Sequence, residues 1–133
     1  MIAAYEEAGV NVYQIPAEAG LPYQVYARDS SVMTPWGAII MQMEKPYRRG
    51  EYAAVLRFYL EHGIPIYDIV SAGNVEGGDF MVLKPGVAIC GYSGERSIEP
   101  AVNQLKNWFE AEGWEFMTYA LIRISCIWTC RWE

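Results

Sequence analysis

Two short acidic motifs hold the residues best suited to chemistry. They are Tyr26–Ser31 (YARDSS) and Gly73–Phe80 (GNVEGGDF), and each leads into a predicted strand. The carboxylates of Asp29, Glu76 and Asp79 would converge if the two segments belonged to units arranged around one axis. Converging carboxylates suit a planar guanidinium, which pairs with them through parallel hydrogen bonds. The glycine pair inside the second motif also favours a binding site, because glycine lets a backbone approach a ligand closely.

A plainer interpretation of the same residues stays open. Arg28 and Asp29 are adjacent and would form a local ion pair, and Glu76 to Asp79 would form a tight turn around the two glycines. Neither arrangement needs a ligand. The residue types and their spacing leave the binding site and the local structure as alternatives.

One arginine precedes each of two predicted helices, namely Arg48 in Lys45–Arg49 and Arg96 in Gly91–Ser97. A cation close to a helix N-terminus is opposed by the helix dipole. We therefore expect Arg48 and Arg96 to bind a ligand carboxylate rather than to stabilise the helices. A solvated arginine is the alternative at both positions.

Amphipathic helices and β-rich segments must position these motifs. Apolar residues recur at helical spacing in Tyr47–His62 and in Ser97–Glu112, where Ser97 is the expected N-cap. A short helix is expected over Ile2–Ala8. Each helix ends at a glycine and leads into a predicted strand, and two hairpins are expected as well. The strands are expected over Val10–Ile15, Ile64–Val70 and Trp114–Tyr119, and the hairpins over Val32–Met41 and Phe80–Cys90.

These elements repeat at a spacing of 50 residues. Four pairs show the spacing: Asp29 and Asp79, Pro35 and Pro85, Phe58 and Trp108, and Gly63 and Gly113. Repeats of this length are typical of arrays and propellers, whose units bury their faces against neighbours and number at least about three. The chain holds two complete units and the end of an earlier one. We therefore expect it to self-associate or to combine with a complementary fragment.

Composition and charge exclude several classes of partner. A net charge of −6 and a pI near 4.8 argue against nucleic acid and anionic membranes. No apolar run reaches the roughly 20 residues that span a bilayer, and the first residues do not form a signal peptide, which predicts a cytoplasmic protein. With one histidine and three cysteines (Cys90, Cys126 and Cys130) at no metal-binding spacing, no metal and no cofactor is expected.

Four motifs, in this order and spacing, resemble those of the guanidino-group modifying enzymes. They are Arg28-Asp29, Lys45–Arg48, Glu76–Asp79 and Gly91–Ser97. This superfamily contains the arginine deiminases, the dimethylarginine dimethylaminohydrolases and the amidinotransferases. The resemblance implies an α/β fold (α+β in some schemes), a partial pentein built from ββαβ units of a five-bladed α/β-propeller. It extends over residues 1–119, with units of about 1–25, 26–70 and 71–119.

The resemblance also implies a role for each site residue. Asp29 matches the carboxylate that holds the substrate guanidinium, and Glu76 matches the acidic residue beside the guanidinium and the catalytic histidine. Asp79 matches a position that supports the site. Arg48 and Arg96 match arginines that hold the α-carboxylate of the substrate, although the loop before Arg96 carries one residue more than the common pattern.

The family's nucleophile and acid–base residue have no match in this sequence. Family members attack the guanidinium carbon with a cysteine near the C-terminus and use the histidine of a His-x-Asp motif. Here His62 is expected at a helix end and Cys90 in the core. The expected function is therefore a fragment of a guanidino-group hydrolase or amidinotransferase that acts on arginine or a derivative and is inactive alone. A non-enzymatic self-associating module and one piece of a split enzyme are the alternatives.

The repeat pattern stops after Tyr119, which makes residues 120–133 an atypical tail. Read in a shifted frame, the codons of Leu121–Thr129 can encode Asp-Pro-His-Phe-Leu-His-Leu-Asp, which contains a histidine motif like that of the family. We hypothesise a frameshift near residues 118–121. An ordinary tryptophan-rich strand is the alternative for the tail.

Overall fold

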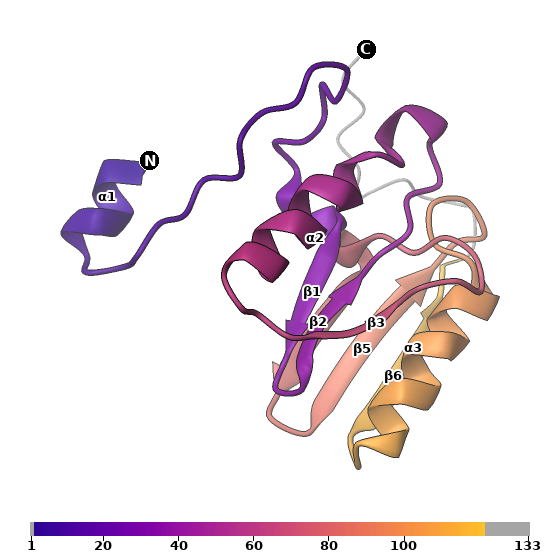
Figure 1. The fold of residues 1–133 in the computed structure, drawn as a ribbon. Helices are drawn as coiled ribbons and strands as arrows, with labels where there is room; N and C mark the ends of the chain where they lie inside the picture. Colours follow the sequence, from indigo (N-terminus) through magenta and orange to yellow (C-terminus); the bar gives the residue numbers. More distant parts are fainter. Residues whose placement is uncertain (1, 122–133) are drawn as a thin grey trace.

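The computed structural model describes residues 2–121, and the frameshift hypothesis for the tail concerns residues outside this range. The helices are α1 (Ile2–Glu7), α2 (Glu51–Glu61) and α3 (Glu99–Ala111). The strands are β1 (Ser31–Thr34), β2 (Gly37–Ile40), β3 (Ile66–Ile69), β4 (Phe80–Lys84), β5 (Val87–Tyr92) and β6 (Glu115–Ala120). Three 3-10 turns cover Ala27–Asp29, Pro46–Arg48 and Gly77–Asp79. Figure 1 shows α1 and the chain that follows it extending away from the remaining elements.

The strands form two sheets of the same topology, in the orders β1-β2-β3 and β4-β5-β6. In each sheet the first two strands are an antiparallel hairpin, and the third strand pairs in parallel with the second after a helical crossover. The predicted ββαβ unit and the mixed α/β fold are therefore confirmed. Neither three-stranded sheet closes on itself, so a propeller remains a prediction.

All three helices end in the same way, which extends the repeat to α1. Gly9, Gly63 and Gly113 have positive φ, a conformation that glycine adopts without a Cβ clash. After each glycine, the next N–H donates to the carbonyl oxygen five residues back, for example from Val10 to Tyr5 and from Trp114 to Phe109, both at 2.9 Å. This shared ending agrees with the prediction that the first helix is the end of an earlier unit, which stays a prediction.

The prediction of a strand over Val10–Ile15 was wrong, although the segment keeps a strand-like position against α2. Tyr13 packs on Phe58 with ring centroids 6.0 Å apart, and Tyr67 of β3 packs on Trp108 at 6.2 Å. Each tyrosine is the fourth residue after the glycine that ends its helix. Within residues 2–121 no hairpin lies beside this segment, and an extended chain without a paired neighbour is not a strand.

The two longer helices begin later than predicted. In α2 the chain first makes a separate turn at Pro46–Arg48, and the helix starts at Glu51. In α3 the N-cap is Ile98 and not Ser97, because the Ser97 hydroxyl is hydrogen-bonded to Asp79 instead. The difference at Ser97 arises from a contact with a distant residue, which local propensity does not report.

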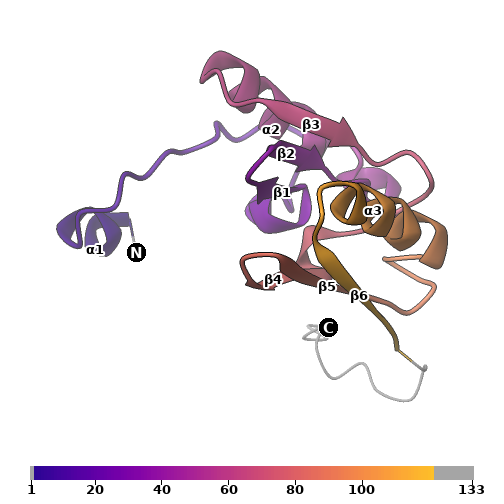
Figure 2. The ribbon, with the colours of Figure 1, turned by 90° about the horizontal axis from the view of Figure 1, so that it is seen from below.

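The hydrophobic core lies between the two sheets, with α3 in the space between them (Figure 2). Ile39 comes from the first sheet and Met41 from the chain just after β2, Leu105 and Phe109 come from α3, and Phe116 comes from the second sheet. None of the helices in residues 2–121 is long and apolar enough to cross a lipid bilayer.

Cys90 and His62 lie where the sequence predicted them. The Cys90 thiol belongs to the core, and its burial raises its pKa to about 12. His62 is the C-cap of α2, and its Nδ1 lies 2.8 Å from the carbonyl oxygen of Phe58. Both side chains are thus engaged in the fold.

Trp36, in the turn between β1 and β2, connects the two units. Its ring lies 5.2 Å from that of Phe109, 5.3 Å from that of Trp114 and 5.6 Å from that of Tyr67, measured between centroids. We expect Trp36→Ala to lower the free energy of unfolding by about 3 kcal/mol, because removal of a packed aromatic ring leaves a cavity. Urea denaturation measures the change, and Met33→Ala on exposed β1 surface is the control. Equal effects of the two substitutions would contradict this role for Trp36.

Candidate functional site

The two acidic motifs lie against each other, and the glycine pair makes this contact possible. A Cβ on Gly77 would collide with the carbonyl oxygen of Arg28, and a Cβ on Gly78 would lie 2.7 Å from Oδ1 of Asp29. The sequence predicted that these glycines let the backbone approach a ligand. In the structure they let the second motif approach the first, which places Glu76 beside Asp29.

The plainer interpretation of the motifs is partly right. The Asp79 N–H donates to the carbonyl oxygen of Glu76 at 3.0 Å, so the second motif is a tight turn. Arg28, however, donates from Nη2 to the carbonyl oxygen of Phe80 at 2.9 Å, while Asp29 is bonded to Arg48. The predicted local pair of Arg28 and Asp29 is replaced by a contact of Arg28 with the second unit and by a contact of Asp29 with Arg48 within the first unit.

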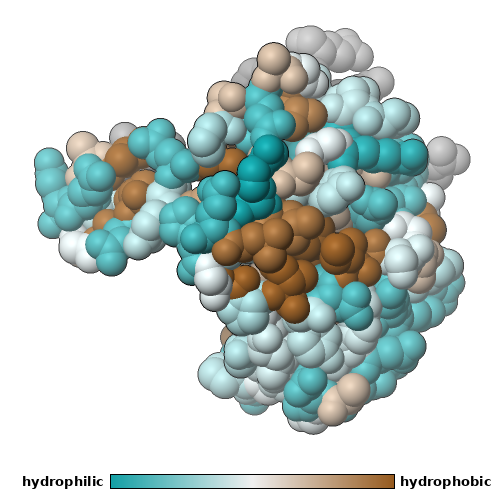
Figure 3. Space-filling view, in the orientation of Figure 1, coloured by the Kyte–Doolittle hydropathy of each residue, from teal (hydrophilic) through white to brown (hydrophobic). Residues whose placement is uncertain are grey.

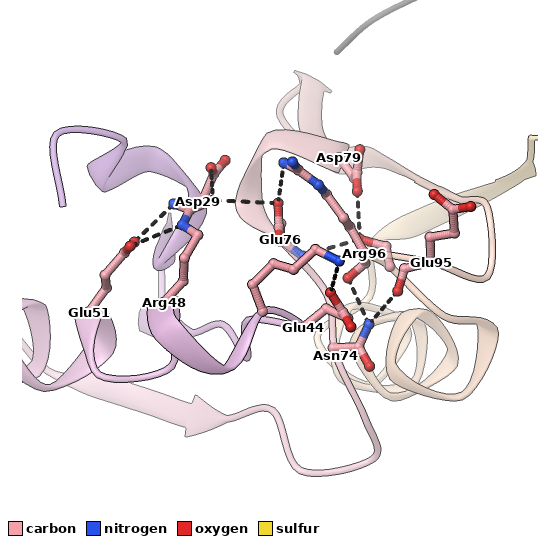
Figure 4. Close-up of polar contacts among 11 residues, drawn as sticks. Asp29, Glu44, Arg48, Glu51, Asn74, Glu76, Asp79, Glu95 and Arg96 are labelled. Carbon is pink, nitrogen blue, oxygen red and sulfur yellow. Dashed lines mark hydrogen bonds and ion pairs between the residues drawn. The ribbon is translucent and has the colours of Figure 1, made fainter. Parts of the chain in front are cut away.

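Arg48 is buried among carboxylates from three parts of the chain (Figure 4). Its Nε and Nη2 each donate to an oxygen of Glu51 at 2.9 Å, and its Nη1 donates to Oδ2 of Asp29 at 3.1 Å. The same Nη1 lies 3.8 Å from Oε2 of Glu76. Burial alone would lower the pKa of the guanidinium, but the hydrogen bonds from Arg48 to Glu51 and Asp29 outweigh burial and raise that pKa.

Arg96 approaches the same acid from the other side and remains accessible. Its side chain is 45% exposed, and Nη1 lies 3.3 Å from Oε2 of Glu76. Asn74 fixes the loop, because its Nδ2 donates to the carbonyl oxygens of Glu95 and Arg96 at 2.8 and 2.9 Å. A guanidinium held in this way at a surface can reach a carboxylate from solvent.

Glu76 is the buried acid at the centre of the network. It is 4% exposed, and its Oε1 is buried without a hydrogen-bond partner among the described residues. Burial raises the pKa of Glu76, and the charge of Arg96 opposes the shift. A buried acceptor without a partner is costly, so this oxygen marks a place where a ligand donor would be stabilising.

Ser97 supports the second motif, a role that the sequence did not reveal. Its hydroxyl donates to Oδ2 of Asp79 at 2.6 Å and accepts from the backbone N–H of Glu76 at 3.1 Å. Burial raises the pKa of Asp79, and the hydrogen bond from Ser97 opposes that shift. The support role that the resemblance implies for Asp79 stays a prediction, with which the bond from Ser97 agrees.

The structure brings all five predicted site residues into one network, namely Asp29, Arg48, Glu76, Asp79 and Arg96. It adds Glu51 and Ser97, whose contacts link residues from different elements. Within residues 2–121, no cluster of three or more His, Cys, Asp or Glu side chains could hold a metal ion. Four carboxylates (Asp29, Glu51, Glu76 and Asp79) and two guanidiniums leave a formal charge of −2, which attracts a cation.

The raised pKa of Glu76 predicts how stability depends on pH. Just above the ordinary pKa of 4.5, the native state retains a proton that the unfolded chain has lost, so stability falls as pH rises. Relative to wild type, Glu76→Gln should therefore gain stability as pH rises from 4 to 7. Urea unfolding at each pH measures this difference, and Glu115→Gln on exposed β6 is the control. A constant difference between wild type and Glu76→Gln would show that Glu76 titrates alike in both states.

The sequence matches that of known proteins over most of its length. The family model described as arginine deiminase matches residues 13–119. The chain is 30% identical over 106 residues to the uncharacterized protein YkgA of Bacillus subtilis (strain 168), covering 80% of this chain and 36% of that protein. It is also 30% identical over 104 residues to an uncharacterized protein of Aeropyrum pernix, covering 77% and 38%. The chain thus spans little more than a third of the length of these relatives.

Solved structures share the fold. A dimethylarginine dimethylaminohydrolase variant, in adduct with S-methyl-L-thiocitrulline, is 25% identical with a TM-score of 0.77, covering 92% of this chain and 48% of that one. The enzyme of Pseudomonas aeruginosa, in complex with citrulline, is 24% identical with a TM-score of 0.77 and the same coverage. The N-terminal domain of ArgZ, a cyanobacterial arginine dihydrolase bound to substrate, is 16% identical with a TM-score of 0.75, covering 91% and 44%.

These matches agree with the geometry of the site, in which carboxylates and arginines from two ββαβ units form one cluster. The family match covers both units and all five predicted site residues. The chain belongs to the arginine deiminase family, within the pentein superfamily of guanidino-group modifying proteins.

Proposed function

We propose that this chain carries the substrate-binding part of an enzyme that modifies the guanidino group of arginine or a related small molecule. The unpartnered Oε1 of Glu76 is the observation that carries the proposal. A guanidinium placed there would donate to Glu76 and lie close to Asp29, in a cluster whose net charge is negative. Arg96, which is partly exposed beside Glu76, would take the carboxylate of the ligand.

In this proposal the chain binds its ligand without turning it over. Covalent attack on a guanidinium carbon needs an accessible thiolate. Within residues 2–121 the one cysteine, Cys90, is buried in the core with a raised pKa, and the one histidine, His62, is engaged at the C-terminus of α2; Cys126 and Cys130 lie outside the described residues. Further ββαβ units would complete a propeller around the cluster, and they would supply the nucleophile and the acid–base residue. Deimination and amidino transfer are both compatible with the residues present.

Calorimetry tests the binding part of this proposal. We expect arginine to bind at least about tenfold more tightly than citrulline, because the neutral ureido group of citrulline forms no charge-assisted bonds with Glu76 and Asp29. Asp29→Asn should weaken arginine binding by a similar factor, whereas Glu61→Gln on the exposed end of α2 should leave it unchanged. Equal affinity for arginine and citrulline would contradict the proposal. Assays for released ammonia and citrulline should show no turnover by this chain.

Self-association is the second candidate, and an exposed apolar sheet face favours it. Met81 pairs with Ile89 and Ile89 with Met117, so these side chains share the face of the second sheet that is opposite the core. Met81 is 54% exposed and Met117 is 36% exposed. Ile39, the residue 50 positions before Ile89, lies instead on the sheet face that is buried against α3.

A second unpartnered apolar surface would complete a head-to-tail contact. Figure 3 shows an apolar area on the part of the molecule that α2 and the start of β3 occupy in Figure 1. Leu60 of α2 and Ile69 of β3 are exposed. In the repeat, α2 corresponds to α3, which the first sheet covers. The outer face of the second sheet in one copy would cover α2 of the next copy in the same way.

Light scattering across a range of concentrations tests this second candidate. The wild-type chain should form oligomers, and Met117→Lys should shift it to monomers because a charge is costly in an apolar interface. Val25→Lys adds the same charge to an exposed loop and is the control. A wild-type chain that remains monomeric would contradict self-association and leave the binding proposal unaffected.

A further inference from the structure

Glu51 is a fully buried acid that the family motifs and the charge pattern did not single out. It is the first residue of α2, it is 1% exposed, and both of its oxygens accept hydrogen bonds from Arg48. A carboxylate is rarely buried to this degree unless it is paired. Its contacts therefore define what it does.

The internal repeat shows that the fold does not need an acid at this position. The residue 50 positions later is Ala101, which is equally buried at the start of α3. Helix α3 forms with alanine there, and its own first residue, Glu99, is exposed. A buried ion pair such as that of Glu51 and Arg48 is also a weak source of stability, because desolvation offsets the attraction. Glu51 is thus a feature of the site and not of the ββαβ unit.

Glu51 fixes the direction of the Arg48 guanidinium. The two bonds from Nε and Nη2 hold the planar group at two points, which prevents its rotation. The rings of Tyr23 and Tyr26 lie over the group, with centroids 5.9 and 5.8 Å from Cζ. As a result, Nη1 points toward Asp29 and Glu76.

The remaining donors of Arg48 are suited to a ligand carboxylate. An arginine side chain has five N–H donors, and Glu51 and Asp29 accept from three of them. One N–H on each terminal nitrogen has no hydrogen bond among the described residues, although the side chain itself is 6% exposed. A lysine at position 48 would keep the charge but would lose the two-point contact with Glu51.

We infer that Glu51 is a positioning residue that orients Arg48 toward a ligand carboxylate and so makes the site prefer guanidines that carry a carboxylate. The inference rests on the proposed function. The proposed function assigned the ligand carboxylate to the more exposed Arg96. The inference adds Arg48, held in place by Glu51, as a second residue that recognises this carboxylate.

Calorimetry with arginine and agmatine tests the inference, because agmatine has the same guanidinium and no carboxylate. We expect Glu51→Gln to weaken arginine binding at least about tenfold and to change agmatine binding less than about twofold. Glu99→Gln removes an exposed acid from the first turn of α3 and should change neither affinity. Retained agmatine binding also shows that the Glu51→Gln variant is folded.

Arg48→Lys provides a second, independent variant. It should produce the same selective loss of arginine binding, and Glu51→Gln should add little in the Arg48→Lys background, because the two residues act as one unit. Equal losses for both ligands, no loss for either, or full additivity of the two substitutions would each overturn the role of Glu51 while leaving guanidine binding established. A wild-type chain that binds neither ligand would overturn the proposed function and this inference together.

Discussion

The close packing of Gly77 on the backbone of Arg28 is the contact on which the site depends. Because no Cβ fits there, the turn of the second motif lies directly against the turn of the first. This contact brings Glu76 and Asp29 within reach of one guanidinium, although they are 47 positions apart in the sequence. Ser97 then fixes the same turn from the other side through its bond to Asp79. The site is therefore a property of the junction between two units and of neither unit alone.

Comparison of the two units separates residues that serve the fold from residues that serve the site. Gly63 and Gly113 end equivalent helices with the same hydrogen bonds, so they belong to the unit. Glu51 and Ala101 occupy equivalent buried positions but differ in charge. The ββαβ unit therefore does not require the acid at position 51. A repeated fold provides this control within one molecule, because a residue that the fold requires recurs at the equivalent position of the other unit.

Sequence periodicity was sufficient to predict both hairpins, both long helices and the ββαβ order, because these features depend on nearby residues. It failed for Val10–Ile15, where strand formation needs a paired neighbour, and for Ser97, whose hydroxyl bonds to a residue 18 positions away instead of capping α3. The five residues predicted for the site were chosen by type and motif, and the structure brings them into one network. Glu51 was missed because an acid near a helix N-terminus is ordinary, and only its burial against Arg48 makes it notable.

Under the proposed function, the charges of the site favour a zwitterionic ligand over a simple cation. In the structure Arg48 neutralises Asp29, which leaves Asp29 with a partner that a ligand guanidinium must replace or share. When the guanidinium of the ligand pairs with Asp29, Arg48 loses that partner. A ligand that also carries a carboxylate supplies Arg48 with a new one. The number of ion pairs then does not fall, and no charge is left buried alone, which would be costly. A guanidine without a carboxylate offers Arg48 no such exchange, and it must rely on the unpartnered oxygen of Glu76.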